Sequence, residues 1–64
     1  MNNIAELEIE RIYLYNKIYD LQEIVNSSLF EKYDPHLQSF IEIQLKAMET
    51  YFTCLNAQIN YIKN

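Results

Sequence analysis

The chain has 64 residues, enough for one domain, which we place at residues 1–64, and a domain this small is marginally stable unless something else supports it. One cysteine and one histidine exclude an internal disulfide and a His/Cys metal cluster, and the absence of glycine excludes a glycine-rich phosphate loop. A net charge of −4 argues against nucleic-acid binding, and no apolar run is long enough for a membrane span, so we expect a cytoplasmic protein with no cofactor.

The first helix is predicted at about residues 3–26. Asn3 is a favoured N-cap residue, and Glu6 follows three positions later, as in a capping box. Apolar residues then recur at steps of three and four, which places them on one face of a helix as a heptad seam. Arg11 is the single charged member of this seam. The seam consists of Ile4, Leu7, Arg11, Leu14, Ile18, Leu21 and Val25.

Residues 26–34 are predicted to connect two helices. The Asn-Ser-Ser run at 26–28 ends the first helix, because these side chains compete for backbone hydrogen bonds. Ser28 and Glu31 have capping-box spacing, which predicts one short helical turn over residues 29–32. Three side chains nearby are too apolar for a free loop, so we expect them to fold back over the end of the hairpin. They are Leu29, Phe30 and Tyr33.

The second helix is predicted at about residues 35–62. Asp34 is a favoured N-cap, and Pro35 suits the first helical position because its φ is already helical. The short connection predicts that the two helices are antiparallel neighbours, so the fold class is an all-α helical hairpin. The apolar stripe of this helix consists of Ile41, Leu45, Met48, Phe52, Leu55, Ile59 and Ile62.

Each predicted helix also carries apolar residues beside its seam, and this arc is too wide for a contact between two helices. Self-association into a homo-oligomeric helical bundle would cover it, and this is the arrangement we expect. The alternative is that the tyrosines simply remain in water. The flanking residues are Ala5, Ile9, Ile12, Tyr15, Tyr19 and Ile24 in the first helix and Phe40, Ile43, Ala47, Tyr51, Cys54 and Tyr61 in the second.

Arg11 is the main candidate binding residue, because an arginine on an apolar seam needs an anionic partner. It either grips a phosphate or carboxylate of a ligand, or it lays its stem on the core and pairs with Glu8 or Glu49. We expect an antiparallel hairpin to place it opposite residues 48–52, beside Glu49 and Tyr51.

Aromatic and polar side chains supply the other candidates. Tyr15 belongs to a segment with Tyr13, Tyr19 and Lys17, and such a group either stacks a nucleobase and holds a phosphate or fills an interface. Tyr51 and Gln58 belong to a similar strip of the second helix. We expect His36 at the surface and Cys54 as a small buried residue without a histidine partner. No constellation of these residues indicates catalysis, so we predict that the protein is not an enzyme.

Residues 30–34, 37–51, Leu55 and Ile59 resemble small phage-encoded helical-hairpin proteins, with the likeness centred on Gln-Leu-x-Ala-Met-x-x-Tyr at residues 44–51. Some hairpins of this kind are anti-defence sponges, which assemble into oligomers and sequester the cyclic nucleotide or ADP-ribose-like signals of bacterial CBASS and Thoeris systems. The resemblance implies signal binding without catalysis, in pockets between protomers, inside an infected bacterium.

Such hairpins tend to carry an arginine near the end of the second helix, where this chain has residues 56–59, so Arg11 and Lys17 would have to supply the positive charge. Two other functions remain open: an acidic inhibitor that binds a host defence protein, as anti-CRISPR proteins do, and a structural oligomer without a ligand. The predicted ligand-binding residues are Arg11, Tyr15, Lys17, Tyr51 and Gln58.

Overall fold

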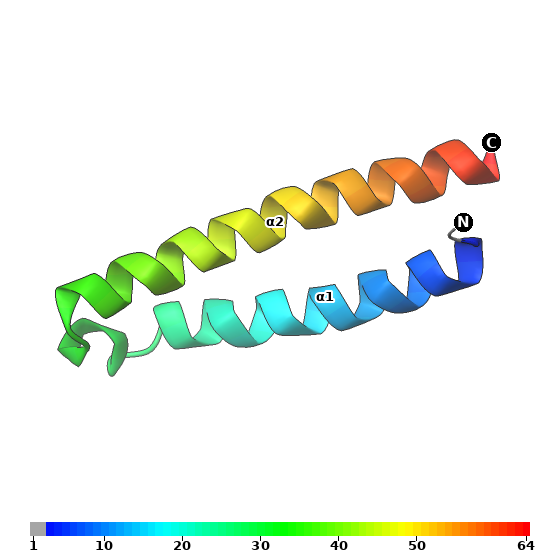
Figure 1. The fold of residues 1–64 in the computed structure, drawn as a ribbon. Coiled ribbons are helices and arrows are strands. Elements are labelled where there is room, and N and C mark those ends of the chain that lie inside the picture. Colours follow the sequence, from blue (N-terminus) through cyan, green and yellow to red (C-terminus); the bar gives the residue numbers. More distant parts are fainter. Residues whose placement is uncertain (1–2) are drawn as a thin grey trace.

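Two long antiparallel helices form the hairpin in the computed structural model, which describes residues 3–64 (Figure 1). Helix α1 spans Ile4–Val25, the 3₁₀ helix η1 spans Phe30–Lys32, and α2 spans Pro35–Lys63. The start of α1 and the end of α2 lie together, at the end opposite the connection (Figure 1). No strand occurs within residues 3–64, and the predicted all-α hairpin is confirmed. Residues 1 and 2 of the predicted domain lie outside the described part, and that domain assignment remains a prediction.

Both helices begin at the predicted caps. The Asn3 side-chain oxygen accepts a hydrogen bond from the Glu6 backbone N–H at 2.9 Å, and the Asn3 amide donates to Glu6 Oε1 at 3.4 Å. The Asp34 carboxylate accepts from the His36 backbone N–H at 3.0 Å, with Pro35 in the first turn. The bonds from the Glu6 and His36 N–H groups satisfy backbone donors that have no partner within their own helix.

The connection packs under the start of α2. Phe30 is buried, and its ring centroid lies 5.9 Å from that of Tyr33. The Gln38 side chain donates to the carbonyl oxygens of Phe30 and Tyr33 at 2.8 and 3.1 Å. The predicted fold-back is therefore confirmed for Phe30 but wrong for Leu29, which is 59% exposed. The short turn forms without the expected Ser28 cap, since no side chain caps η1.

The core runs along the contact between the two helices, from Leu7 to Ile18 on α1. Leu55 and Ile59 of α2 are completely buried, and they pack with three buried residues of the α1 seam. Full burial of one such side chain contributes roughly 1.5–3 kcal/mol. Ile62 also falls on the predicted stripe but remains 49% exposed. The three buried α1 residues are Leu7, Leu14 and Ile18.

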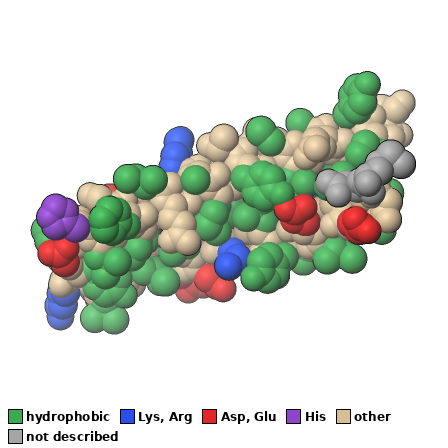
Figure 2. Space-filling view, viewed as in Figure 1, with side chains coloured by type: hydrophobic (Ala, Val, Ile, Leu, Met, Phe, Trp, Pro, Cys, Tyr) green, Lys and Arg blue, Asp and Glu red, His purple; other side chains and the backbone are tan. Residues whose placement is uncertain are grey.

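Much of the second apolar face lies at the surface of the hairpin. Green apolar side chains reach the surface along the whole visible length in Figure 2. Cys54 is also exposed, so the expectation that it is buried was wrong. Its neighbour Leu55 faces α1. Because consecutive residues of a helix point about 100° apart, Cys54 is turned away from α1. The large exposed residues beside the two seams are Ile9, Ile12, Tyr15, Tyr19, Ile24, Phe40, Ile43, Tyr51 and Tyr61.

Candidate functional site

A groove runs between the helices along one edge of the hairpin, and we call it the Arg11 groove. Its walls are Arg11, Ile12 and Tyr15 of α1 and Phe52 and Asn56 of α2, and its volume is about 320 Å³. That volume is at the lower end of the range for small-molecule sites. The Tyr15 and Phe52 rings are tilted by 44° with centroids 6.1 Å apart, so the groove has an aromatic wall.

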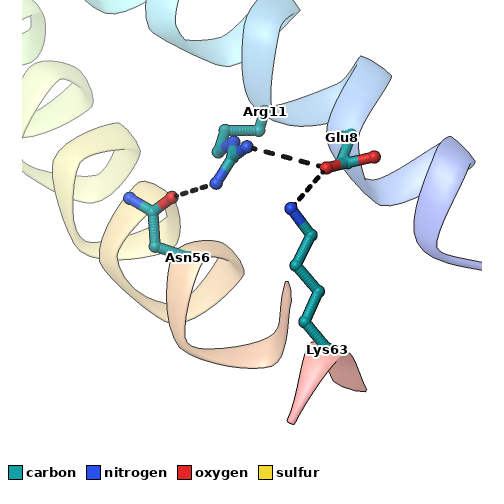
Figure 3. Close-up of polar contacts among 4 residues, drawn as sticks. All are labelled: Glu8, Arg11, Asn56 and Lys63. Atoms are coloured by element: carbon teal, nitrogen blue, oxygen red, sulfur yellow. Dashed lines mark hydrogen bonds and ion pairs between the residues drawn. The ribbon is translucent and has the colours of Figure 1, made fainter. Parts of the chain in front are cut away.

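Arg11 supplies the positive charge of this groove. Its Nη1 donates a hydrogen bond to Oδ1 of Asn56 at 3.1 Å, and its Nη2 lies 4.0 Å from Oε2 of Glu8 (Figure 3). A guanidinium has five N–H donors; the neutral amide of Asn56 does not offset its charge, and the Glu8 carboxylate, at 4.0 Å, offsets it only in part. The arrangement can therefore accept an anionic group of a ligand.

Glu8 has a second and closer cationic partner. Nζ of Lys63, in the last turn of α2, lies 2.9 Å from the same Oε2 atom of Glu8 (Figure 3). The hydrogen bond and the positive charge of Lys63 lower the pKa of Glu8 below its ordinary value, with a smaller contribution from the charge of Arg11. Glu8 is therefore ionised at neutral pH, and Lys63 rather than Arg11 is its main partner.

Asn56 and Lys63 are site residues that were not predicted, although the sequence contains a pattern that marks them. Glu49, Asn56 and Lys63 stand seven residues apart and so lie on one face of α2. Each of them contacts α1. Gln22 donates to Glu49 at 3.0 Å, Arg11 donates to Asn56, and Lys63 pairs with Glu8. A heptad row of polar residues beside an apolar seam was the available signal.

Phe52 of the predicted segment 48–52 does line the groove with Arg11, but the expected neighbours Glu49 and Tyr51 were wrong. The residue expected opposite it, Glu49, bonds Gln22, whereas Arg11 reaches Asn56. The physical reason lies in the connection. The first turns of α2 pack over η1, as the Gln38 bonds show, so the part of α2 that faces α1 begins further along the chain.

Of the five predicted ligand-binding residues, the structure places Arg11 and Tyr15 in the groove. Tyr51 lies elsewhere, because its hydroxyl donates a hydrogen bond to the carboxylate of Glu10. This bond to the carboxylate raises the pKa of Tyr51 above its ordinary value. Glu10 precedes Arg11 by one residue, so the two side chains point about 100° apart around α1.

Lys17 and Gln58 lie on the same edge of the hairpin as Tyr51, and not on the edge that carries Arg11. Lys17 stands seven residues after Glu10 and therefore shares its face of α1, with Nζ 5.2 Å from the centroid of the Tyr13 ring. Gln58 stands seven residues after Tyr51 and shares its face of α2. These three predicted residues thus lie along the opposite edge of the hairpin, away from the groove.

The remaining side chains that carry chemistry are dispersed. Within residues 3–64, no three His, Cys, Asp or Glu side chains gather closely enough to hold a metal ion. In the same part of the chain, neither helix combines the length and the apolar character that a membrane crossing requires. His36 is exposed, as predicted.

No curated protein and no solved structure matches this chain. One family model does match, that of Sequestin, and the match extends over residues 1–61. It covers both helices except the end of α2, and it includes every residue that lines the Arg11 groove. The family name denotes a binding and sequestering role, as expected from the resemblance to small sequestering hairpins, and the chain belongs to the Sequestin family.

Proposed function

We propose that this protein binds and sequesters a small nucleotide immune signal, either a cyclic nucleotide or an ADP-ribose derivative, and does not convert it. It acts in the cytoplasm of a phage-infected bacterium as an anti-defence protein. The observation that carries the proposal is the guanidinium of Arg11 at one end of an apolar, aromatic groove. Membership of the Sequestin family supports a sequestering role.

The chemistry of the groove matches the two parts of a nucleotide. A phosphate has two oxygens that a guanidinium can grip together, and the Asn56 amide adds a neutral donor beside it. A nucleobase is flat and stacks on aromatic rings, which Tyr15 and Phe52 provide. No nucleophile, acid and base are gathered in the groove, and this composition fits retention of a ligand better than its conversion.

Self-association is the second part of the proposal. The chain exposes 5107 Å², whereas a compact monomer of 7.7 kDa exposes about 4,300 Å². Ile12 and Tyr15 are 62% and 57% exposed at the open side of the groove. A second copy seated there would cover them and enclose the ligand.

Calorimetry with purified protein tests the binding of a signal. The panel contains cyclic dinucleotides, cyclic mononucleotides and ADP-ribose, and at least one of these ligands is expected to bind. Arg11→Ala abolishes that binding, and Arg11→Lys restores little of it, because an ammonium cannot grip two oxygens at once. Lys17→Ala is the matched control, since it removes one positive charge from the opposite edge and leaves binding unchanged.

Each outcome separates the functions considered for this chain. Absence of heat with the whole panel overturns nucleotide sequestration. A defined host defence protein that then forms a complex with the pure chain supports the inhibitor, and an oligomer with neither ligand nor partner supports a structural role. Equal loss of binding in Arg11→Ala and Lys17→Ala would contradict the placement of the site.

A further inference from the structure

From the cluster of Glu8, Arg11 and Lys63 we infer that the Arg11 groove selects ligands with one negative charge on each phosphate over ligands with a terminal phosphate. The inference rests on the proposed function and adds a specificity to it. Phosphodiesters and the internal pyrophosphate of ADP-ribose belong to the selected class. Nucleoside monophosphates, nucleoside diphosphates and ring-opened dinucleotides with an end phosphate belong to the excluded class.

The formal charge of the cluster is the first step. Arg11 and Lys63 each carry +1 and Glu8 carries −1, so the sum beside the groove is +1. All three are linked through one atom, since Oε2 of Glu8 lies 2.9 Å from Nζ of Lys63 and 4.0 Å from Nη2 of Arg11. Glu49 is the next acid along this edge of α2. It bonds Gln22 and stands about 10 Å of helix from Asn56.

The charge on a phosphate is the second step. A diester carries a single negative charge, whereas a terminal phosphate loses its second proton near pH 6 and carries almost two at neutral pH. When a phosphate binds Arg11, its first negative charge is balanced by the net charge of +1 on the cluster. A second negative charge on the same phosphate is repelled by the carboxylate of Glu8. Two like charges about 4 Å apart in water lower affinity by about fivefold.

Lys63 keeps Glu8 in this position. Its pairing with Glu8 joins the last turn of α2 to the first turns of α1 and holds the carboxylate beside Arg11. Lys63 lies beyond the residues that the Sequestin model matches, so this cation is a feature of the chain outside that match. Glu8 and Lys63 are thus positioning and selectivity residues, and Arg11 is the residue that touches the phosphate.

Two matched ligand pairs test the inference by calorimetry on the full chain. One pair is ADP-ribose and ADP, and the other is cyclic di-AMP and its linear form with a 5′-phosphate. For whichever pair binds, the native protein prefers the first member. Glu8→Gln narrows that preference about fivefold by removing the repulsion. Lys63→Gln weakens binding of both members and widens the preference.

Glu23→Gln is the matched control, because it removes the same charge from α1 roughly four helical turns away. It leaves the preference unchanged, and a thermal melt of each variant verifies that the hairpin is folded. If neither pair binds the native protein, this inference is overturned, whereas the proposed function fails only if the whole ligand panel gives no heat. If both members of a pair bind equally well, or Glu8→Gln lowers only the melting temperature, the inference alone is overturned.

Discussion

Arg11 in α1 donates a hydrogen bond to Oδ1 of Asn56 in α2, joining residues 45 positions apart in the sequence at 3.1 Å. The partner is a neutral amide, although an acid at this position would pair with the guanidinium more strongly. The bond therefore orients Arg11 without cancelling its charge. Because Asn56 orients Arg11 and is itself neutral, a charge introduced at position 56 tests whether the groove binds an anionic ligand.

Asn56→Asp is expected to weaken binding of a nucleotide ligand at least fivefold while the hairpin stays folded. The new carboxylate pairs with the guanidinium and repels the phosphate, and an ion pair that remains partly open to solvent changes stability by about 1 kcal/mol. Calorimetry measures the affinity, and circular dichroism follows the melt. Asn60→Asp is the control, because it adds the same charge one turn later at an exposed position. Equal affinities of Asn56→Asp and native protein would contradict the groove.

Leu55→Ala is expected to destabilise the hairpin by about 2–5 kcal/mol, because Leu55 is completely buried and its loss leaves a cavity. Phe52→Ala costs less than the same change at a fully buried position, because Phe52 is only partly buried. Urea unfolding followed by circular dichroism measures both values. Ile43→Ala, at a position 66% exposed, serves as the control and changes stability by no more than about 0.5 kcal/mol. A larger loss for Ile43→Ala than for Leu55→Ala would show that the helix phase is wrong.

Asp34→Ala is expected to cost about 1 kcal/mol, because the first turn of α2 loses the carboxylate that accepts from the His36 N–H. Asp34→Asn keeps an acceptor at the same position and preserves most of the stability. Thermal melts of the two variants measure the difference between them. Identical melting temperatures for the alanine and asparagine variants would show that the cap contributes nothing.

Acid is expected to weaken the contact between the ends of the hairpin. The folded-state pKa of Glu8 is lower than its ordinary value of 4.5, so its pairing with Lys63 stabilises the fold above that pH. The contribution is lost as the pH falls through the lowered value. Melting temperatures of native protein and Glu8→Gln therefore differ slightly at pH 7 and converge as the pH falls through the lowered pKa of Glu8. A difference that persists after Glu8 is protonated would contradict this assignment.

Alkali is expected to act on the opposite edge. The folded-state pKa of Tyr51 is higher than its ordinary value of 10.0, so the bond from its hydroxyl to Glu10 contributes stability below that pH. The contribution disappears as the pH rises through the raised value. Spectrophotometric titration of native protein against Tyr51→Phe isolates this phenol. A Tyr51 that titrates below pH 10 would contradict the bond.

Ile12→Glu is expected to shift the assembly toward monomer. Light scattering at micromolar concentration should give at least a dimer for the native chain, since the open side of the groove exposes apolar surface. Ile12 is 62% exposed in the single hairpin, so the new charge leaves the fold intact and opposes only the contact between protomers. Leu29→Glu, at a position 59% exposed on the connection, is the control. A native protein that scatters as a folded 7.7 kDa monomer would contradict self-association.

The sequence alone determined the local structure of this protein. Side-chain caps and helical periodicity act over a few residues, so Asn3, Asp34 and the two apolar seams predicted the helices to within one residue at each end. Periodicity also predicted that both seams face each other, and it marked Arg11 as unusual. These features depend on neighbours in the chain and on the turn of a helix, which the order of residues specifies directly.

The tertiary structure decided the register of the two helices, and with it the site. Phe30 and Gln38 pack the connection under the first turns of α2, and this shift brings Asn56 rather than Glu49 to Arg11. The same shift brings Lys63 to Glu8. Helical periodicity specifies which face a residue occupies but not which turn of the other helix lies opposite. If one helix slides along the other by two turns, apolar residues of the two seams still face each other. Only the packing of the connection selects one of these positions.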